Sequence, residues 1–178
     1  MQGERVTLRD GSEVLIREVR PDDKPLFEAG FARLGDRSRY QRFLSFRGGL
    51  TEGELAFFTE LDHDDHDAVG AIDARTGEGL GVARLLRLRD DPSRAEAAAT
   101  VIDPWQGRGL GTEIMRRLCD RAAARGVRRL SATLLASNRA MLAVFERVGP
   151  VRVVARYGVT IEIEVELPPP PPPGEGGP

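Results

Sequence analysis

The sequence predicts an α/β (α+β) fold in which a mixed, mostly antiparallel central sheet is flanked by helices. Two observations support this fold class. Three short apolar segments, residues 68–73, 80–88 and 96–102, are separated by turns and have the pattern of an antiparallel meander. A glycine-rich hexapeptide, residues 106–111, then lies between the last strand and a helical pattern, after which strands and helices alternate.

The composition limits the class of protein. A chain of 178 residues is expected to form one domain with a real core. Its formal net charge of -2 lacks the basic footprint of a nucleic-acid partner. No apolar run approaches the ~20 residues of a membrane span, so no membrane partner is expected. The single cysteine, Cys119, permits no internal disulfide, which fits a reducing compartment and a cytoplasmic protein.

The N-terminal third predicts a hairpin and a helix. Residues 5–9 alternate in polarity, Asp10-Gly11 provides the turn, and residues 14–16 resume the strand. Pro21 begins a helix, with apolar residues at helical spacing at Leu26, Phe27, Phe31 and Leu34. Residues 38–43 mix aromatic and basic side chains. They indicate either a helix whose aromatics pack inward or a wall of an acceptor site.

A capping box and an acidic run follow. Thr51 and Glu54 have capping-box spacing, which predicts a helix through Leu61. Residues 62–67 read Asp-His-Asp-Asp-His-Asp, which invites a metal site, but no other segment supplies ligands and we expect no metal. A solvated acidic loop with a local structural role is the favoured interpretation. Contact with a basic acceptor is an alternative.

The C-terminal half predicts two helices and three strands. Residues 112–125 form an amphipathic helix closed by Gly126, and a strand follows at 127–135. Ser137-Asn138 caps a last helix that stops at Gly149-Pro150. Two final strands lie at 151–154 and 159–163, and the domain ends at Leu167. Residues 168–178 form a Pro/Gly-rich tail, expected to be disordered; a proline-motif ligand is the alternative.

The hexapeptide at 106–111 predicts an anion site. The first amides of a helix lack intrahelical partners, and the helix dipole adds positive charge there. Glycines let the backbone approach a phosphate closely. The P-loop requires a Lys-Ser/Thr pair where this chain has Thr112-Glu113. The dinucleotide fingerprint Gly-x-Gly-x-x-Gly requires a glycine at position 112 or 114, where this chain has Thr112 and Ile114. The P-loop and the dinucleotide fingerprint are therefore both excluded, and the pattern that remains is Gln-x-x-Gly-x-Gly.

This motif resembles the acetyl-CoA loop of the GNAT superfamily of N-acetyltransferases. The element order to Leu167 is similar to the GNAT fold, so residues 1–167 are expected to form one GNAT domain. Residues 38–43, 61–66, 81–84, 95–96 and above all 101–111 look most like the bacterial Pat-type protein lysine acetyltransferases. Some of those enzymes carry a regulatory domain that binds cyclic nucleotides or resembles an acyl-CoA synthetase; none is expected in this chain.

The resemblance implies a cosubstrate, acetyl-CoA, held where the sheet splays. Backbone groups of Val101 and Ile102 would pair with the pantetheine arm, and the Ile102 amide would stabilise the oxyanion. Asn138 would contact the same arm, or act only as an N-cap. Arg108 would add charge at the pyrophosphate, or be solvated. The loop and the amides that would hold the pyrophosphate comprise Gln106, Gly107, Arg108, Gly109, Leu110, Gly111 and Thr112.

Glu96 is the expected catalytic residue. It matches the glutamate that Pat-type enzymes use as general base, and it is the only ionisable side chain in residues 95–99. A solvent-facing strand glutamate is the alternative. Many GNAT enzymes place a tyrosine on the last helix to protonate the leaving thiolate, whereas this chain has Phe145. Cys119 is expected to be a core residue, rather than a covalent nucleophile.

Three functions therefore remain open. The leading hypothesis is acetyl transfer from acetyl-CoA to a lysine ε-amine of a protein. The second is the same chemistry on a small-molecule or N-terminal amine. The third is an acyl-CoA-binding sensor without turnover, which the absent tyrosine favours and Glu96 disfavours. A monomer or a homodimer is expected.

Overall fold

A computed structural model describes residues 3–45 and 48–169 of the chain, so most of the predicted tail lies outside the described residues. The strands are β1 (Glu4–Thr7), β2 (Glu13–Glu18), β3 (His66–Asp73), β4 (Gly79–Arg87), β5 (Arg94–Val101), β6 (Arg129–Leu135), β7 (Val151–Tyr157) and β8 (Thr160–Glu166). The helices are α1 (Lys24–Ala32), α2 (Asp36–Phe43), α3 (Glu52–Thr59), α4 (Leu110–Ala124) and α5 (Arg139–Glu146), with short 3-10 turns at Pro21–Asp23 and Asp103–Trp105.

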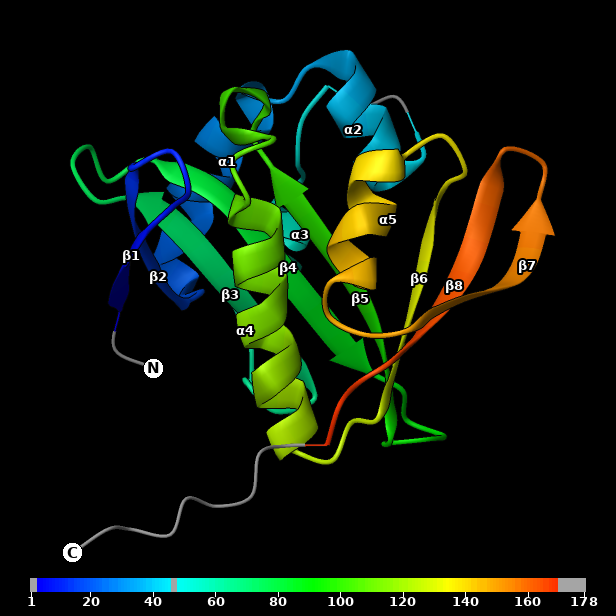
Figure 1. The fold of residues 1–178 in the computed structure, drawn as a ribbon. Coiled ribbons are helices and arrows are strands. Elements are labelled where there is room, and N and C mark those ends of the chain that lie inside the picture. Colours follow the sequence, from blue (N-terminus) through cyan, green and yellow to red (C-terminus); the bar gives the residue numbers. More distant parts are fainter. Residues whose placement is uncertain (1–2, 46–47, 170–178) are drawn as a thin grey trace, which may run out of the picture.

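The described strands form one mixed sheet in the order β1-β2-β3-β4-β5-β6-β8-β7 (Figure 1). All neighbouring pairs are antiparallel except β5 and β6, which are parallel. A parallel pair needs a crossover connection, and α4 supplies it between β5 and β6. The predicted mostly antiparallel sheet is thus confirmed, with its one parallel junction at the start of β5.

The helices cover both faces of the sheet. In Figure 1, α4 and α5 lie side by side on one face, and α4 contacts β3, β4 and β5. On the opposite face α1 packs against β4 and α3, while α2 lies at the end of the sheet near the glycine loop. Within the described ranges, no helix combines the length and apolar character needed to cross a bilayer.

The core lies mainly between α4 and the sheet. The apolar face predicted for this helix is buried as expected; its members are Ile114, Met115, Leu118, Ala122 and Ala123. Small side chains at Ala95, Ala97 and Ala99 of β5 are buried on the same side, which allows the helix to approach the strand closely. Cys119 is also buried in this core, where burial raises the pKa of its thiol to about 12.

Several predicted boundaries shift for local reasons. The helix expected at 112 begins at Leu110, because Gly109 adopts φ 89° and serves as its N-cap. The capping box of α3 is confirmed, with Glu54 N–H donating to Thr51 Oγ1 at 3.2 Å. The segment at 38–43 is helical, and its Phe43 ring packs 5.8 Å from that of Phe31. Phe43 therefore packs inward, and residues of the same segment also line a groove described below.

Candidate active site

The parallel strands β5 and β6 separate at Glu96, the candidate general base. β5 and β6 pair only at Arg94–Arg129, Ala95–Leu130 and Glu96–Ser131. Both strands continue, β5 to Val101 and β6 to Leu135, without further pairing to each other. The two strands therefore form a V with Glu96 at its apex, and the edge of β5 beyond Glu96 faces a gap.

A groove occupies this gap. Its volume of about 510 Å³ lies within the range of about 300–1,000 Å³ typical of small-molecule sites. Its walls are the diverging parts of β5 and β6, the glycine loop, α5 and the end of α2. Glu96, Gly109 and Asn138 line the groove together, although 42 residues separate the first from the last. The fold thus brings three predicted site residues to one surface.

The glycine loop presents a helix N-terminus to the groove. Gly107 and Gly109 have φ of 77° and 89°, a left-handed backbone that favours glycine. The Glu113 N–H donates to the Gly109 carbonyl at 3.1 Å, so the amides of residues 110–112 precede the first helical hydrogen bond. No side chain caps this end of α4. The arrangement can therefore bind an anion, as a pyrophosphate would require.

Two side chains of the loop are engaged within the protein. Gln106 Nε2 donates to the Val101 carbonyl at 3.0 Å and to Ser38 Oγ at 3.2 Å, so it ties the loop to β5 and α2. Arg108 Nη1 donates to Asp10 Oδ2 at 3.1 Å, and its guanidinium lies 4.7 Å from the Trp105 ring. Arg108 thus binds the β1–β2 hairpin.

Arg9 is a groove residue that the sequence reasoning missed. It follows β1 on the hairpin, its side chain is exposed, and it lines the groove. Its Nε lies 3.9 Å from the position that a Cβ on Gly109 would occupy. No local motif marks Arg9, because only the tertiary fold brings the hairpin to the glycine loop. A cation here complements the charge of a phosphate.

The backbone of β5 corrects one expectation. The Ile102 N–H donates to the Leu80 carbonyl of β4 at 2.9 Å, so this amide faces away from the gap and is not placed to stabilise an oxyanion. Hydrogen-bonding direction alternates along a strand. The amides of Ala99 and Val101 therefore lie on the edge that faces the gap. These two residues, rather than Ile102, offer the open amides for a pantetheine arm or an oxyanion.

Asn138 has the structural role expected of an N-cap. Its Oδ1 accepts from Met141 N–H at 3.2 Å, which fixes the first turn of α5. The same side chain lines the groove, so its amide NH₂ remains on the wall where a cosubstrate arm would lie. Phe145, about two turns further along α5, is 1% exposed, and no hydroxyl takes the place of the absent tyrosine at that position.

Glu96 lies on the face of the sheet opposite α4. Its neighbours Ala95 and Ala97 are buried against α4, whereas Glu96 is exposed toward the groove. Within the described part of the chain, Glu96 forms no hydrogen bond or ion pair. Its carboxylate is thus available to accept a proton from a group entering at the apex.

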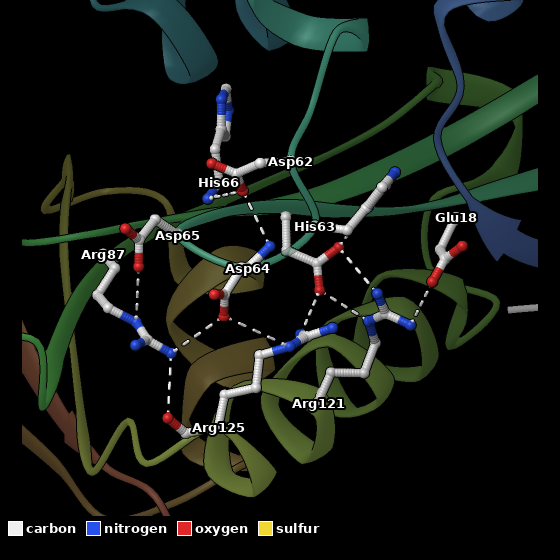
Figure 2. Close-up of polar contacts among 10 residues, drawn as sticks. Glu18, Asp62, His63, Asp64, Asp65, His66, Arg87, Arg121 and Arg125 are labelled. Atoms are coloured by element: carbon white, nitrogen blue, oxygen red, sulfur yellow. Dashed lines mark hydrogen bonds and ion pairs between the residues drawn. The ribbon is translucent and has the colours of Figure 1, made fainter.

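The acidic loop is not simply solvated. Asp67 of this loop is fully buried and binds two arginines of the α4 end, Arg121 at 2.7 Å and Arg125 at 2.9 Å (Figure 2). His63 Nδ1 lies 2.9 Å from Asp67 Oδ1. Burial by itself raises the pKa of Asp67, but hydrogen bonds from Arg121 and His63 outweigh it, and the net pKa is lowered.

The other acidic residues of the loop also make contacts within the protein. Asp62 Oδ1 accepts from the backbone amides of Asp64 and His66, and the Asp65 carboxylate lies 3.3 Å from Arg87 (Figure 2). No group of three or more His, Cys, Asp or Glu among the described residues could hold a metal ion. The loop anchors the C-terminal end of α4 to β3, so it supports the helix whose other end faces the groove.

A sheet that parts beside an uncapped helix N-terminus is the arrangement of an acyl-CoA-dependent transferase. The profile of the acetyltransferase (GNAT) domain matches residues 13–151. The chain therefore belongs to the acetyltransferase (GNAT) family.

Individual relatives agree with this family. The chain is 34% identical over 156 residues to the acetyltransferase Pat of Mycolicibacterium smegmatis, an alignment that covers 88% of this chain and 46% of that protein. It is 33% identical over 140 residues to the acetyltransferase PA5475 of Pseudomonas aeruginosa, covering 76% of this chain and 73% of that protein. The chain thus spans less than half of the M. smegmatis relative.

A solved structure matches over nearly the whole chain. The GNAT domain of S. lividans PAT superposes with a TM-score of 0.84 at 26% identity, covering 93% of this chain and 97% of that one. The fold predicted from the sequence is therefore confirmed.

Proposed function

We propose that this protein transfers the acetyl group of acetyl-CoA to a lysine ε-amine of a protein, with Glu96 as the general base. The observation that carries this proposal is the position of Glu96 at the apex of the gap, where the last pair between β5 and β6 is formed. A carboxylate with no ion pair lies there, beside the β5 edge that would hold the thioester.

The cosubstrate would lie along the groove. Its pyrophosphate fits the open amides of residues 110–112, reinforced by the exposed guanidinium of Arg9. Its pantetheine arm fits the β5 edge at Ala99 and Val101, with Asn138 on the opposite wall. This arrangement directs the thioester toward Glu96, because the gap narrows in that direction.

The reaction requires a proton acceptor. A lysine amine has a reference pKa of about 10.4, so it is almost entirely ammonium at neutral pH. In the proposed step Glu96 takes this proton, directly or through one water molecule. The amine nitrogen then attacks the thioester carbon, the new C–N bond forms, and the C–S bond breaks. The nitrogen loses its second proton to water as the amide forms, and the thiolate of coenzyme A leaves unprotonated or takes a proton from water, since Phe145 offers none.

The acceptor class is supported by resemblance and by an open groove. Residues 101–111 match the Pat-type lysine acetyltransferases, and the named relatives include an acetyltransferase Pat. The Asp62–Asp67 loop does not support electrostatic capture of a basic protein, because Asp62 and Asp67 are engaged within the fold. Acceptor recognition must therefore depend on the surface around Glu96.

The test is release of free coenzyme A from acetyl-CoA in the presence of a panel of purified proteins, followed by mass spectrometry of modified lysines. Acetylated lysines on a few acceptors, absent without the enzyme, would support the proposal. Turnover confined to a panel of small amines would move the acceptor to the small-molecule class. Tight acetyl-CoA binding without any turnover would leave a sensor instead of an enzyme.

A further inference from the structure

A second cavity adjoins the groove on the other side of β5. We call this cavity the side chamber; it has a volume of about 100 Å³ and lies between the sheet and helices α1, α2 and α3. Arg42, Phe43, Ala98 and Thr100 line both the side chamber and the groove. The rest of its wall is largely apolar and includes Phe31, Leu50, Phe58 and Val82.

Arg84 of β4 provides a partly buried cation in this wall. Its guanidinium carbon lies 4.7 Å from the ring centroids of both Phe57 and Phe58. Its Nη1 atom is buried and has no hydrogen-bond partner. Arg84 also forms no ion pair within the described residues, whereas Arg17, which lines the same chamber, is paired with Asp23 at 2.6 Å.

A buried, unpaired guanidinium is costly unless an anion accompanies it. Burial, with a contribution from Arg42, lowers the pKa of Arg84 to about 10, so this side chain remains cationic at neutral pH. The two phenylalanine faces compensate part of the lost hydration. They supply no hydrogen-bond acceptor for Nη1. The Glu96 carboxylate attracts the Arg84 charge and opposes the lowering of its pKa, but it forms no hydrogen bond with Nη1.

The position of the chamber restricts what can reach Arg84. In the β4–β5 register Arg84 is opposite Ala98, two residues from Glu96 on the same face of the sheet. The acyl end of the cosubstrate would therefore reach the groove wall that the chamber shares. About 10–15 Å³ suffices for one water molecule, so a chamber of about 100 Å³ admits several non-hydrogen atoms.

We propose that the side chamber receives the terminal carboxylate of a dicarboxylic acyl-CoA, of malonyl or succinyl size, and that Arg84 binds this carboxylate. This inference rests on the proposed cosubstrate site in the groove. An uncharged acyl chain of the same length would cover Arg84 and leave it unpaired.

The experiment is titration calorimetry of the whole chain with five thioesters: acetyl-, propionyl-, malonyl-, butyryl- and succinyl-CoA. Malonyl-CoA is compared with propionyl-CoA and succinyl-CoA with butyryl-CoA, because the members of each pair differ only in whether the acyl chain ends in a carboxylate or in a methyl group. A hydrogen-bonded charge pair predicts about 10- to 100-fold tighter binding of at least one carboxylated thioester. Arg84→Met is expected to abolish this preference while changing the acetyl-CoA Kd less than about twofold.

The controls separate the possible failures. Arg89→Met removes an exposed arginine that lines neither cavity, and it should leave every Kd unchanged. If Arg84→Met does not fold, the comparison of carboxylated with uncharged thioesters on the wild-type protein tests the inference. Equal binding of carboxylated and uncharged thioesters by wild type would overturn the inference but leave the groove site intact. Binding of none of the five would instead contradict the proposed cosubstrate site.

Discussion

Removal of the buried carboxylate at Asp67 should weaken the fold severely. Asp67→Asn leaves the guanidiniums of Arg121 and Arg125 facing a neutral amide in a site with no solvent exposure at Asp67. Breaking a buried ion pair in this way costs about 3–5 kcal/mol. For a domain of this size, such a loss corresponds to a fall in Tm of about 6–20 °C.

Urea unfolding followed by circular dichroism measures this loss directly. Asp64→Asn is the matched control from the same loop, because the Asp64 side chain is 71% exposed and its nearest cations are 3.9 Å away. It should cost less than about 1 kcal/mol. A loss below about 1 kcal/mol for Asp67→Asn as well would refute the assignment of Asp67 as a buried anchor of α4.

The comparison of wild type with Asp67→Asn also predicts how the free energy of unfolding depends on pH. Burial raises the pKa of Asp67, but the arginine and histidine contacts lower it by more than burial raises it. The folded pKa therefore lies below the unfolded value of about 3.9. A lowered carboxylate pKa stabilises the fold above the unfolded pKa and ceases to do so as the pH falls through the folded pKa. The stability gap between wild type and Asp67→Asn should therefore be constant from pH 7 to 5 and narrow below pH 4.

Three further predictions concern single sites. Cys119, whose buried thiol has a pKa raised to about 12, should not react with a thiol reagent at pH 8 until the protein unfolds; rapid native labelling would contradict its burial. Gly149→Ala should cost about 3 kcal/mol or more in urea unfolding, because the new Cβ would overlap the Glu166 carbonyl oxygen. Asn138→Ala should lose about 1 kcal/mol of stability and weaken acetyl-CoA binding, whereas Asn138→Ser should restore the cap alone. Restoration of both by serine would show that the amide does not bind the cosubstrate.

Local signals were sufficient for most of the fold. The capping box at Thr51, the turn at Asp10-Gly11 and the apolar stripe of α4 each depend on neighbours in the sequence, so they could be predicted. The pairing limits of β5 and β6 could not, because strand pairing depends on residues far apart. The V at Glu96 was expected only through the family resemblance.

The charged residues show why the rest of the site could not be predicted from the sequence. Asp67 has the sequence context of a solvated loop, yet its arginine partners lie 54 and 58 residues further along the chain. Arg108 has the context of a phosphate ligand, yet its partner Asp10 lies 98 residues earlier. No periodicity encodes such pairs. The chamber at Arg84 is likewise formed by three helices and four strands that only the tertiary fold assembles.

The central claim is that Glu96 accepts the proton of the acceptor amine at the apex of the splayed strands. The most direct measurement is kcat together with the acetyl-CoA Kd for Glu96→Gln, with Glu146→Gln as the control, since Glu146 is exposed on α5 outside the groove. Loss of a general base predicts a kcat lower by about 10²–10⁴-fold, with the acetyl-CoA Kd within about twofold of wild type and the control fully active. A Glu96→Gln variant with wild-type kcat at saturating acetyl-CoA and acceptor would contradict this account.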